Sequence, residues 1–451
     1  MTKKFHFIGI GGAGMSGLAE ILLLSGCEVS GSDLQDSSSL ERLRQLGAQV
    51  FIGHDSDNLS SVDTVVFSSA VSGGNPELVK ARSLCSTVIS RGELLADLMN
   101  SRKGISVAGT HGKTTTTAMI GLCLLKAGID PTVVVGARFE VMHSNARLGK
   151  GEWFVAEADE SDRSFLMLSP FCSVVTNIDL DHMDEYHDLV DLQDAFLKHL
   201  NRTATEGLVV ACTQDVGVMK ILKKLHLRVV TYGLEMEADV CARQLELAWR
   251  NASYDCYEDG ECLGRIRLGV PGRHNVLNSL AAVAVARKIL QVPFEIIQDS
   301  LEAFHGVERR LQWKGERGGV WVVDDYAHHP AEIRATLETC KVVGRRIIVI
   351  FQPHRYTRTQ YVMKELSQCF NDADILYLMD IYPAGEQPIA GVTSEHLAHE
   401  IGRFRAVNYL SDEKQLLMDL KEEVRAGDLL ITLGAGNVWE IGAAFLEKEN
   451  L

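Results

Sequence analysis

Residues 104–117 read GISVAGTHGKTTTT, and this stretch decides the expected architecture. A short apolar run from Ile105 to Ala108 leads into a tight turn, and a helix-like segment follows from Ala118 to Lys126. Backbone N–H groups at such a helix start carry the positive end of the helix dipole, so they bind phosphate. Lys113 adds a cation for the β- and γ-phosphates, and the Thr114 hydroxyl is placed to ligate Mg²⁺. The stretch therefore predicts a nucleotide-binding loop between a strand and a helix.

The generic phosphate loop has a glycine five residues before its Gly-Lys pair, and Val107 stands at that position. An ordinary strand-to-helix turn with a surface lysine is therefore the alternative interpretation. We favour the nucleotide loop, because the run from Gly109 to Thr114 brings glycine, lysine and hydroxyl groups together.

The size and charge of the chain limit the classes of protein to which it belongs. A length of 451 residues indicates about three domains at roughly 150 residues each. The net charge of -15 argues against nucleic acid or an anionic membrane as the main partner. Ten scattered cysteines without a C-x-x-C pair indicate free thiols in a reducing compartment. We expect a cytoplasmic monomer or weak dimer whose partners are small molecules.

Strand-like and helix-like segments alternate along most of the sequence, which predicts an α/β fold of parallel sheets with crossover helices. Residues 101–104 resemble a linker, and alternating polar and apolar residues at 239–269 indicate a small antiparallel sheet. We expect strands at 5–10, 64–67, 105–108, 320–323, 346–351, 375–379 and 429–433, and helices at 18–24, 118–126 and 276–290. The expected domains are a Rossmann-like N-terminal domain (1–102), a central P-loop-type ATPase domain with a mostly parallel sheet (103–310) and a Rossmann-like C-terminal domain (311–451).

Two expected strands of the central domain end in acidic side chains. Residues 157–162 read EADESD directly after one apolar run, and residues 177–184 read NIDLDHMD directly after the next. Carboxylates at the carboxyl ends of strands beside a phosphate loop suit Mg²⁺ or Mn²⁺. His182 is a candidate ligand for a second divalent ion, or a group that orients a carboxylate. Solvated acidic loops are the alternative.

The N-terminal segment contains a second glycine-rich turn. Residues 9–14 read GIGGAG after the first expected strand, and Asp33 follows about twenty residues later. This spacing is close to the dinucleotide fingerprint, and such a turn also accommodates the diphosphate of a nucleotide sugar. A tight turn that binds nothing is the alternative. The candidate ligand-binding residues are Gly11, Gly12, Ala13, Gly14, Met15, Ser16 and Asp33.

Two strand ends of the third domain carry histidine and arginine. Residues 324–330 read DDYAHHP and residues 351–359 read FQPHRYTRT, and 433–437 form a third loop of this kind. Carboxyl ends of parallel strands face one crevice, so we expect these loops to meet. Arg355 and Arg358 would supply fixed positive charge for phosphate or carboxylate oxygens.

A nucleotide site flanked by a diphosphate-binding domain and a domain rich in arginine and histidine suggests an enzyme that joins two molecules. Phosphorylation of a carboxylate creates a good leaving group, and an amine can then displace phosphate. Mg²⁺, Lys113 and the arginines would stabilise the charge that develops. Two alternatives remain: an NAD-linked oxidoreductase, indicated by the N-terminal glycines and Asp33 alone, and a non-catalytic ATP-gated binding protein.

The chain resembles the Mur ligases of bacterial cell-wall synthesis over nearly its whole length. This resemblance implies that the first domain binds a UDP sugar, the second ATP and the third the incoming amino acid, in peptidoglycan precursor synthesis. It favours the members that join L-alanine to UDP-N-acetylmuramate through an acyl phosphate. A recycling member that attaches an intact tripeptide is the alternative, since Ala327 and Ala331 depart from the frequent residues. The motifs are GIGGAGMS (9–16), GTHGKTT (109–115), EADESD (157–162), GRHNVLN (272–278), RR (309–310), DDYAHHP (324–330) and PHRYTRT (353–359).

The resemblance also implies roles for individual residues. Thr114 and Glu157 would ligate the first Mg²⁺, and Glu157 with His182 the second. Several related ligases carry a carbamylated lysine on the helix after the His182 segment; Lys198 lies nearby and is left out of the expected site. The implied catalytic residues are Lys113, Glu157, His182, His328, Arg355 and Arg358. The implied nucleotide-binding residues are Gly109, Thr110, His111, Gly112, Lys113, Thr114, Thr115, Asn275, Asn278 and Arg310, with Asn275 or Asn278 near adenine. The alanine and acyl-phosphate site would comprise Tyr326, His328, Arg355 and Arg358.

Overall fold

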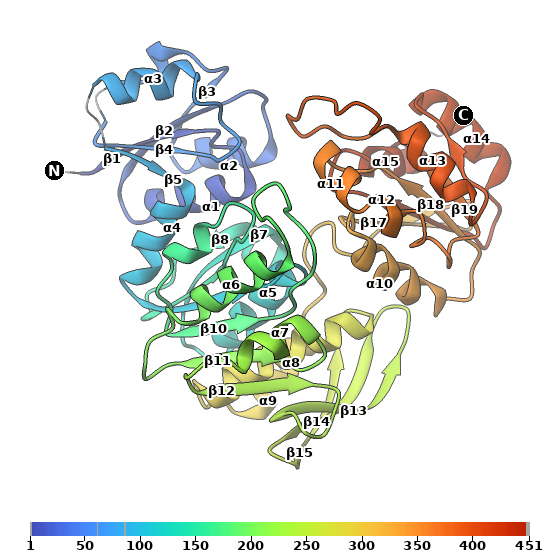
Figure 1. Ribbon diagram of the computed structural model, residues 1–451. Coiled ribbons are helices and arrows are strands. Elements are labelled where there is room, and N and C mark those ends of the chain that lie inside the picture. Colours follow the sequence, from blue (N-terminus) through green and yellow to red (C-terminus); the bar gives the residue numbers. More distant parts are fainter. Residues whose placement is uncertain (1, 61, 85–86, 448–451) are drawn as a thin grey trace.

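The computed structural model describes residues 2–60, 62–84 and 87–447, so Cys85, one of the expected free thiols, lies outside the described part. Three sheets follow one another along the chain and are covered by helices, as Figure 1 shows in blue, green to yellow, and orange to red. The expected α/β fold is therefore confirmed. Within the described residues, no helix has the length and apolar character that crossing a membrane requires.

The first sheet lies in the N-terminal part and has the order β3-β2-β1-β4-β5 in the described residues, with all neighbours parallel. This order is typical of a Rossmann-like half. Gly9 has a φ of +81°, so the first strand ends at Ile8 instead of Ile10, and the helix after the glycine turn begins at Ala13 instead of Leu18. The strands are β1 (Lys4–Ile8), β2 (Glu28–Asp33), β3 (Gln49–Ile52), β4 (Thr64–Phe67) and β5 (Thr87–Ser90), and the helices α1 (Ala13–Leu24), α2 (Ser38–Gln45), α3 (Pro76–Ser83) and α4 (Arg91–Asn100).

The second sheet has the order β15-β14-β13-β12-β11-β10-β6-β9-β7-β8 among the described residues. Its inner strands pair in parallel, with β6 between β10 and β9. The strands are β6 (Lys103–Ala108), β7 (Thr132–Phe139), β8 (Ser144–Arg147), β9 (Trp153–Glu157), β10 (Cys172–Val175), β11 (Leu208–Cys212), β12 (Val229–Gly233), β13 (Val240–Leu247), β14 (Ala252–Glu258) and β15 (Glu261–Leu268). The helices are α5 (Lys113–Lys126), α6 (Leu189–Leu200), α7 (Val216–Leu222), α8 (Arg273–Lys288) and α9 (Phe294–Glu302).

Several boundaries in the second unit differ from the expectation. The antiparallel strands β13 to β15 are present, but they continue the central sheet through the parallel pair β12–β13. Lys103 and Gly104 belong to β6, so the expected linker at 101–104 is shorter than predicted. Helix α5 begins at Lys113, five residues before Ala118, because Thr114 to Thr117 are buried and tertiary packing outweighs the low helix propensity of threonine.

The third sheet has the order β16-β17-β21-β18-β19-β20 within the described part of the chain. Only the β16–β17 pair is antiparallel there. The strands are β16 (Gln312–Arg317), β17 (Val320–Asp325), β18 (Ile347–Phe351), β19 (Ile375–Leu378), β20 (Asn408–Tyr409) and β21 (Leu429–Leu433). The helices are α10 (Pro330–Lys341), α11 (Tyr356–Tyr361), α12 (Met363–Leu366), α13 (Ser394–Gly402), α14 (Glu413–Glu423) and α15 (Trp439–Glu447). Short 3-10 helices lie at Ser56–Asn58, Glu140–Met142 and Ser164–Met167.

The core explains why strand β6 is apolar without interruption. Val107 packs in a cluster with α5, α8 and α9, whereas its neighbour Ala108 packs in a second cluster with α6 and α7. A strand buried on both faces loses the alternation of polar and apolar residues. The second cluster also contains Phe7 and Leu18 of the first domain, so apolar packing runs from the first sheet into the central one and fixes their relative position.

Candidate functional site

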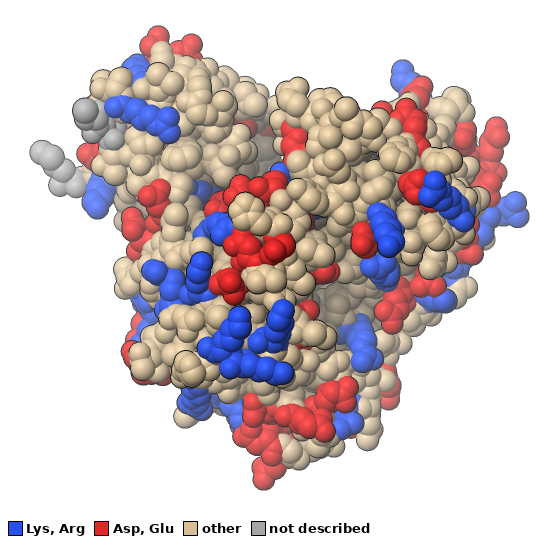
Figure 2. Space-filling model, viewed as in Figure 1, with Lys and Arg blue, Asp and Glu red and all other residues tan. Residues whose placement is uncertain are grey.

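A cleft of about 1160 Å³ is lined by residues from all three domains. Figure 2 shows the surface hollowed between the first and third domains, with acidic side chains along the central domain beside it. The cleft lies where the carboxyl ends of parallel strands meet, as expected for open α/β sheets. The expected site residues that line it are Gly11, Ala13, Ser16, Thr110, Gly112, Lys113, Thr114, Glu157, His182, Arg310, Tyr326, His328, Arg355 and Arg358.

Other expected site residues lie outside this cleft. Asp33 accepts hydrogen bonds from the backbone N–H groups of Gly11 and Leu34, both at 2.8 Å, so its carboxylate braces the glycine turn. Asn275 lines a second cleft, which it shares with Arg310. A smaller neighbouring cavity is lined by Gly12, Ala13, Gly14 and Met15. Among the described residues, Asp33, Gly109, His111, Thr115 and Asn278 line none of these three cavities.

The phosphate loop requires glycine at two positions. Gly109 has a φ of +138°, and a Cβ atom there would lie 2.0 Å from Thr176 Oγ1. Gly112 has a φ of +80° and is the N-cap of α5, and a Cβ atom there would lie 2.6 Å from Asn278 Oδ1. The His111 N–H donates to Asn177 Oδ1 at 2.8 Å, which ties the loop to the end of β10. These contacts hold the loop in one conformation against two neighbouring segments.

The ammonium group of Lys113 lies inside the loop. It donates to both carboxylate oxygens of Glu160, at 2.7 and 2.8 Å, and to the Gly109 carbonyl oxygen at 2.6 Å. Burial alone would lower the pKa of Lys113, but the Glu160 carboxylate raises it, so the amine is charged. Burial raises the pKa of Glu160 to about 7 against the opposing effect of Lys113. A fixed cation therefore stands at the start of α5.

Thr114 and Glu157 form a pair of oxygen ligands beside this cation. Thr114 Oγ1 lies 3.1 Å from Glu157 Oε2, and Glu157 Oε1 accepts a short hydrogen bond from the Gly136 N–H. Burial raises the pKa of Glu157, which indicates a site where a cation would favour the charged carboxylate. A hydroxyl and a carboxylate are hard oxygen donors, so the pair suits Mg²⁺.

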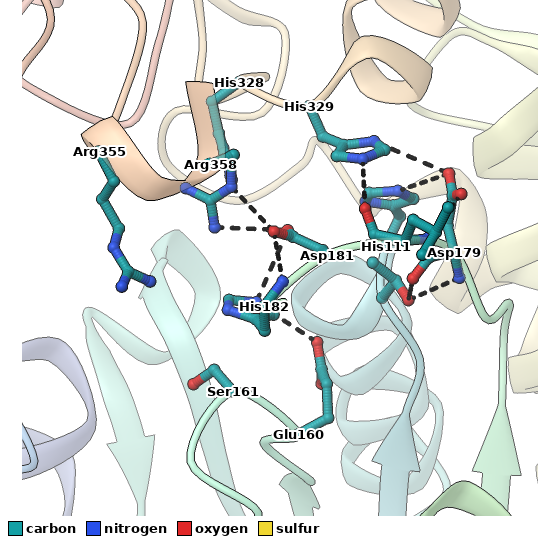
Figure 3. Close-up of polar contacts among 12 residues, drawn as sticks. His111, Glu160, Ser161, Asp179, Asp181, His182, His328, His329, Arg355 and Arg358 are labelled. Carbon is teal, nitrogen blue, oxygen red and sulfur yellow. Dashed lines mark hydrogen bonds and ion pairs between the residues drawn. The ribbon is translucent and has the colours of Figure 1, made fainter. Parts of the chain in front are cut away.

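His182 enters the cleft from the NIDLDHMD loop in a left-handed backbone conformation, with a φ of +56°. Its Nε2 lies 3.6 Å from Asp181 Oδ2 and 3.8 Å from Glu160 Oε1 (Figure 3). Burial lowers the pKa of His182, so the imidazole is neutral and available as a ligand. Its Nδ1 is buried with no hydrogen-bond partner among the described residues. The carboxylates nearest to His182 Nε2 are thus those of Glu160 and Asp181. The resemblance instead paired His182 with Glu157 at the second ion.

The two arginines of the third domain contact the same acidic loop. Arg358 donates to Asp181 through Nε at 2.9 Å and Nη2 at 3.3 Å, and both side chains are less than a tenth exposed. Burial works against ionisation, but the guanidinium holds the pKa of Asp181 far below its usual range. Arg355 Nη2 lies 2.6 Å from Asp184 Oδ2 and its Nε 2.5 Å from Glu386 Oε1. Figure 3 shows Arg358 directed at Asp181.

The DDYAHHP loop lies beside these arginines, as expected from the strand order. The rings of His328 and His354 have centroids 5.8 Å apart, so the two loops meet. Arg310 lies over the Tyr326 ring at 5.1 Å. His328 Nδ1 is 2.9 Å from the Tyr326 carbonyl oxygen, and burial, with the nearby Arg358 charge, lowers the pKa of His328 to about 3. The imidazole is therefore neutral at physiological pH.

The first domain is connected to the site through Arg91. Its Nη2 donates to Asp159 at 2.8 Å and to Asp162 at 3.3 Å, and a Cβ atom at Gly14 would lie 2.9 Å from its Cδ. Asn145 also bridges to this domain, since its Nδ2 lies 3.1 Å from Ser16 Oγ. The glycine turn and the EADESD loop therefore share one arginine.

Sequence reasoning did not single out several residues that organise the site. Glu160 and Asp181 stand inside the quoted acidic motifs, but nothing in their spacing says which carboxylate meets which cation. Glu332 follows His329 at the capping-box spacing, which is a weak signal of its position. Arg91 is the first residue of α4, where the capping box of Ser90 and Glu93 signals a helix start but not a contact with the site. Lys198, which was left out of the expected site, is exposed on α6.

Three family models match consecutive parts of the chain. They are described as the Mur ligase family, catalytic domain (residues 4–103), the Mur ligase middle domain (107–286) and the Mur ligase, glutamate ligase domain (309–436). A UDP-N-acetylmuramate–L-alanine ligase from Geobacter sp. (strain M21) is 49% identical over 448 residues, covering 98% of this chain and 97% of the relative. The enzyme of the same name from Geotalea uraniireducens (strain Rf4) is 50% identical, covering 99% and 98%.

Solved structures agree with these matches. The crystal structure of a UDP-N-acetylmuramate-alanine ligase from Thermotoga maritima superposes with a TM-score of 0.84 at 30% identity, covering 98% of each chain. A murein peptide ligase from Psychrobacter arcticus superposes with a TM-score of 0.75 at 24% identity, again covering 98% of each chain. The second likeness extends to the fold alone.

Proposed function

This chain belongs to the Mur ligase family, and from that premise we propose that it joins L-alanine to the carboxylate of UDP-N-acetylmuramate with ATP as the energy source. It is an ATP-dependent ligase of peptidoglycan precursor synthesis. One observation carries this function: relatives of that name are about half identical to the chain over almost its full length. The convergence of all three sheets on one cleft supports it independently.

The reaction has two steps that balance in atoms and charge. A carboxylate oxygen of the sugar attacks the γ-phosphorus of ATP, ADP leaves, and an acyl phosphate forms. The amine of L-alanine then attacks the carbonyl carbon, phosphate leaves with that carboxylate oxygen, and the amine loses a proton. Phosphate is therefore the leaving group in amide formation, in place of the oxide or hydroxide that an unactivated carboxylate would have to expel.

We assign the phosphoryl-transfer roles to the central domain. Lys113 and the N–H groups at the start of α5 would bind the β- and γ-phosphates, because a fixed cation and a helix N-terminus both favour anions. Thr110 and Gly112 line the cleft beside them. Arg310 lines both this cleft and the one that contains Asn275, which supports a nucleotide extending from the loop towards Asn275.

The donor set at Thr114 and Glu157 fits Mg²⁺, since both groups offer hard oxygen atoms, and burial raises the pKa of the carboxylate although the Lys113 and Arg310 charges act against it. His182 offers a neutral imidazole whose buried Nδ1 has no hydrogen-bond partner in the part of the chain that the structure describes, which suits a second divalent ion such as Mn²⁺. Bound there, such ions would neutralise charge on the phosphates.

The flanking domains would deliver the two reactants. The diphosphate of the sugar would lie against the N-terminus of α1, which is supported by the cavity lined by Gly12, Gly14 and Arg91. L-alanine and the acyl phosphate would lie between Tyr326, His328, Arg355 and Arg358, which line the same cleft as the phosphate loop. Free thiols at the nine described cysteines support a cytoplasmic location, and a monomer or weak dimer stays a prediction.

The alternatives are weaker. A tripeptide-recycling ligase would share the fold and ATP chemistry, but the relatives that are half identical carry the alanine-ligase name. An NAD-linked oxidoreductase leaves the phosphate loop, the Thr114–Glu157 pair and the arginines without a role. A non-catalytic ATP-gated protein leaves the convergence of three domains unexplained.

A product assay tests the function. The chain is incubated with ATP, UDP-N-acetylmuramate and, in parallel, L-alanine, glycine, L-serine or the tripeptide, and products are identified by mass. We expect UDP-muramoyl-alanine, and phosphate release only when sugar nucleotide and alanine are both present. Lys113→Ala should lower kcat more than 100-fold, a loss of about 3 kcal/mol of transition-state stabilisation. Preferential use of the tripeptide, or phosphate release without either substrate, would contradict the assignment.

A further inference from the structure

Three side chains from the central and third domains lie close together at the phosphate loop. His111 belongs to the loop, Asp179 follows strand β10, and His329 precedes helix α10. One ligand atom from each lies within 4.8 Å of the other two. His111 Nε2 is 3.5 Å from Asp179 Oδ2, and His329 Nδ1 is 3.8 Å from the same oxygen (Figure 3). The imidazoles themselves lie outside the cleft that contains Thr114 and Glu157.

The far nitrogen of each imidazole faces a hydrogen-bond acceptor. His111 Nδ1 is 3.1 Å from Glu332 Oε1, and His329 Nε2 is 3.0 Å from the Leu180 carbonyl oxygen. The near nitrogens, His111 Nε2 and His329 Nδ1, are therefore the atoms that face Asp179. Burial lowers the pKa of His111, but the Glu332 and Asp179 carboxylates raise it to about 9, so a metal ion would displace a proton from this imidazole. Metal-binding histidines are held by the same kind of carboxylate or carbonyl acceptor. The arrangement therefore orients two nitrogen ligands towards one carboxylate.

The near nitrogens have no strong competing contact. His111 Nε2 is buried without a hydrogen-bond partner among the described residues. His329 Nδ1 accepts from the Ala331 N–H at 3.4 Å, a long bond that a metal–nitrogen bond would replace. The two rings lie with centroids 4.7 Å apart and an interplanar angle of 39°.

The donor set favours a transition metal over Mg²⁺. Two imidazole nitrogens and one carboxylate oxygen are typical of Zn²⁺ sites, whereas Mg²⁺ prefers oxygen ligands. Tetrahedral bonds of about 2.0–2.1 Å would place ligand atoms roughly 3.4 Å apart. The separations from Asp179 Oδ2 are 3.5 and 3.8 Å, and all three ligand atoms lie within 4.8 Å of one another, so the side chains would close in on a bound ion.

We propose that His111, Asp179 and His329 form a binding site for a divalent transition-metal ion of the Zn²⁺ class, separate from the Mg²⁺ position at Thr114 and Glu157. The bound ion would cross-link the phosphate loop and the end of β10 to the third domain. With three protein ligands, it would keep one coordination position for water or an anion. The site is independent of which amino acid the protein joins.

Cobalt(II) titration tests this site, because tetrahedral and octahedral Co²⁺ differ strongly in visible absorption. Co²⁺ is added to the full chain without nucleotide, in excess Mg²⁺. We expect intense tetrahedral-type bands that saturate at one ion per chain, and a rise in Tm when Zn²⁺ is added instead. His329→Ala and Asp179→Asn should each lower Co²⁺ affinity at least tenfold, and Glu332→Gln about tenfold, since acceptors behind a ligand contribute 10- to 100-fold.

His396→Ala is the matched control, because that histidine is half exposed on α13 and far from the cluster in sequence. It should bind Co²⁺ as the wild type does. Unchanged affinity in both His329→Ala and Asp179→Asn would overturn the site, as would displacement of Co²⁺ by Mg²⁺. Thiolate-to-cobalt absorption would assign the ion to a cysteine and overturn it too. Far-UV circular dichroism identifies any variant that fails to fold, and the other variant then decides.

Discussion

Lys113 Nζ lies 2.7 Å from Glu160 Oε1, and this ion pair joins the phosphate loop to the acidic end of strand β9. The Glu160 side chain is 1% exposed, and that of Lys113 is 16% exposed. Removing Glu160 would leave the Lys113 ammonium without its partner in a region that excludes water. The pair therefore fixes the position of the cation that we assign to the triphosphate.

Glu160→Gln should destabilise the chain by about 3–5 kcal/mol, because it leaves the buried Lys113 ammonium unpaired. Lys113→Met should cost less, because burial raises the pKa of Glu160 and the carboxyl group can take up a proton once the ammonium is removed. The double variant should lose less than the sum of the two single losses. Urea unfolding of the four proteins measures this coupling. Lys4→Met, which breaks the exposed Lys4–Glu28 pair, is the control and should change the free energy of unfolding little. Strict additivity of the two buried substitutions would contradict the pairing.

Thr114→Val should raise the Mg²⁺ concentration for half-maximal activity at least tenfold, because it removes a hydroxyl that lies 3.1 Å from Glu157 Oε2 and keeps the side-chain volume. Titration of turnover against Mg²⁺ measures the shift. Thr117→Val is the matched control: this hydroxyl lies on the same helix and is buried without a partner among the described residues. Equal Mg²⁺ curves for wild type and Thr114→Val would remove Thr114 from the metal site.

Arg358→Lys should lower kcat/KM more than tenfold although it keeps the charge, because an ammonium group cannot reproduce the two hydrogen bonds to Asp181. The loss should appear with every substrate varied, since Arg358 ties the third domain to the central one. Steady-state kinetics measures it. Arg403→Lys, at an exposed position on the same domain, is the control. If Arg358→Lys had wild-type kinetics, the positive charge at this position would be sufficient for activity without the two hydrogen bonds to Asp181.

His199 makes the free energy of unfolding depend on pH below pH 7. Its ring is fully buried, with Nδ1 2.8 Å from the Phe165 carbonyl oxygen and Nε2 3.1 Å from Ser106 Oγ of strand β6. Burial lowers the pKa of His199 from 6.5 to about 4, so the unfolded chain binds the proton more tightly. The stability that the neutral His199 contributes to the folded chain is fully present above pH 6.5 and is lost as the pH falls through 4.

Urea unfolding of wild type and His199→Gln at pH 7 and pH 5 tests this dependence. The wild type should lose about 2 kcal/mol more than the variant between the two pH values, since one pKa unit corresponds to about 1.4 kcal/mol. The comparison cancels the titration of all other groups. An equal loss in both proteins would show that His199 has the same pKa in the folded and the unfolded chain.

Regular elements of this fold were predictable where one physical signal dominated. The strand at 429–433 lies where expected, because it consists of four apolar residues and one threonine, all of them buried in a parallel sheet. The beginning of α5 was predicted five residues late, since the buried threonines 114–117 are poor helix formers in isolation. Glycine turns were located well, but Gly9 ended β1 earlier than the apolar run suggested.

The contacts of the site were less predictable than its motifs. Loop positions follow from strand order, so the meeting of the DDYAHHP and FQPHRYTRT loops could be inferred. The pairing of Arg358 with Asp181 joins residues 177 positions apart in two domains, and no local pattern encodes it. The same holds for Lys113 with Glu160, because several acidic side chains stand equally near in the sequence. Only the packed structure selects among them.

Oxygen transfer tests the central claim most directly. UDP-N-acetylmuramate labelled with ¹⁸O in both carboxylate oxygens is converted with ATP and L-alanine, and the inorganic phosphate is analysed by mass. Activation of the carboxylate by ATP predicts phosphate carrying one ¹⁸O atom and an amide that keeps the other. Release of unlabelled phosphate, or label transfer that persists undiminished in Lys113→Ala, would contradict the account.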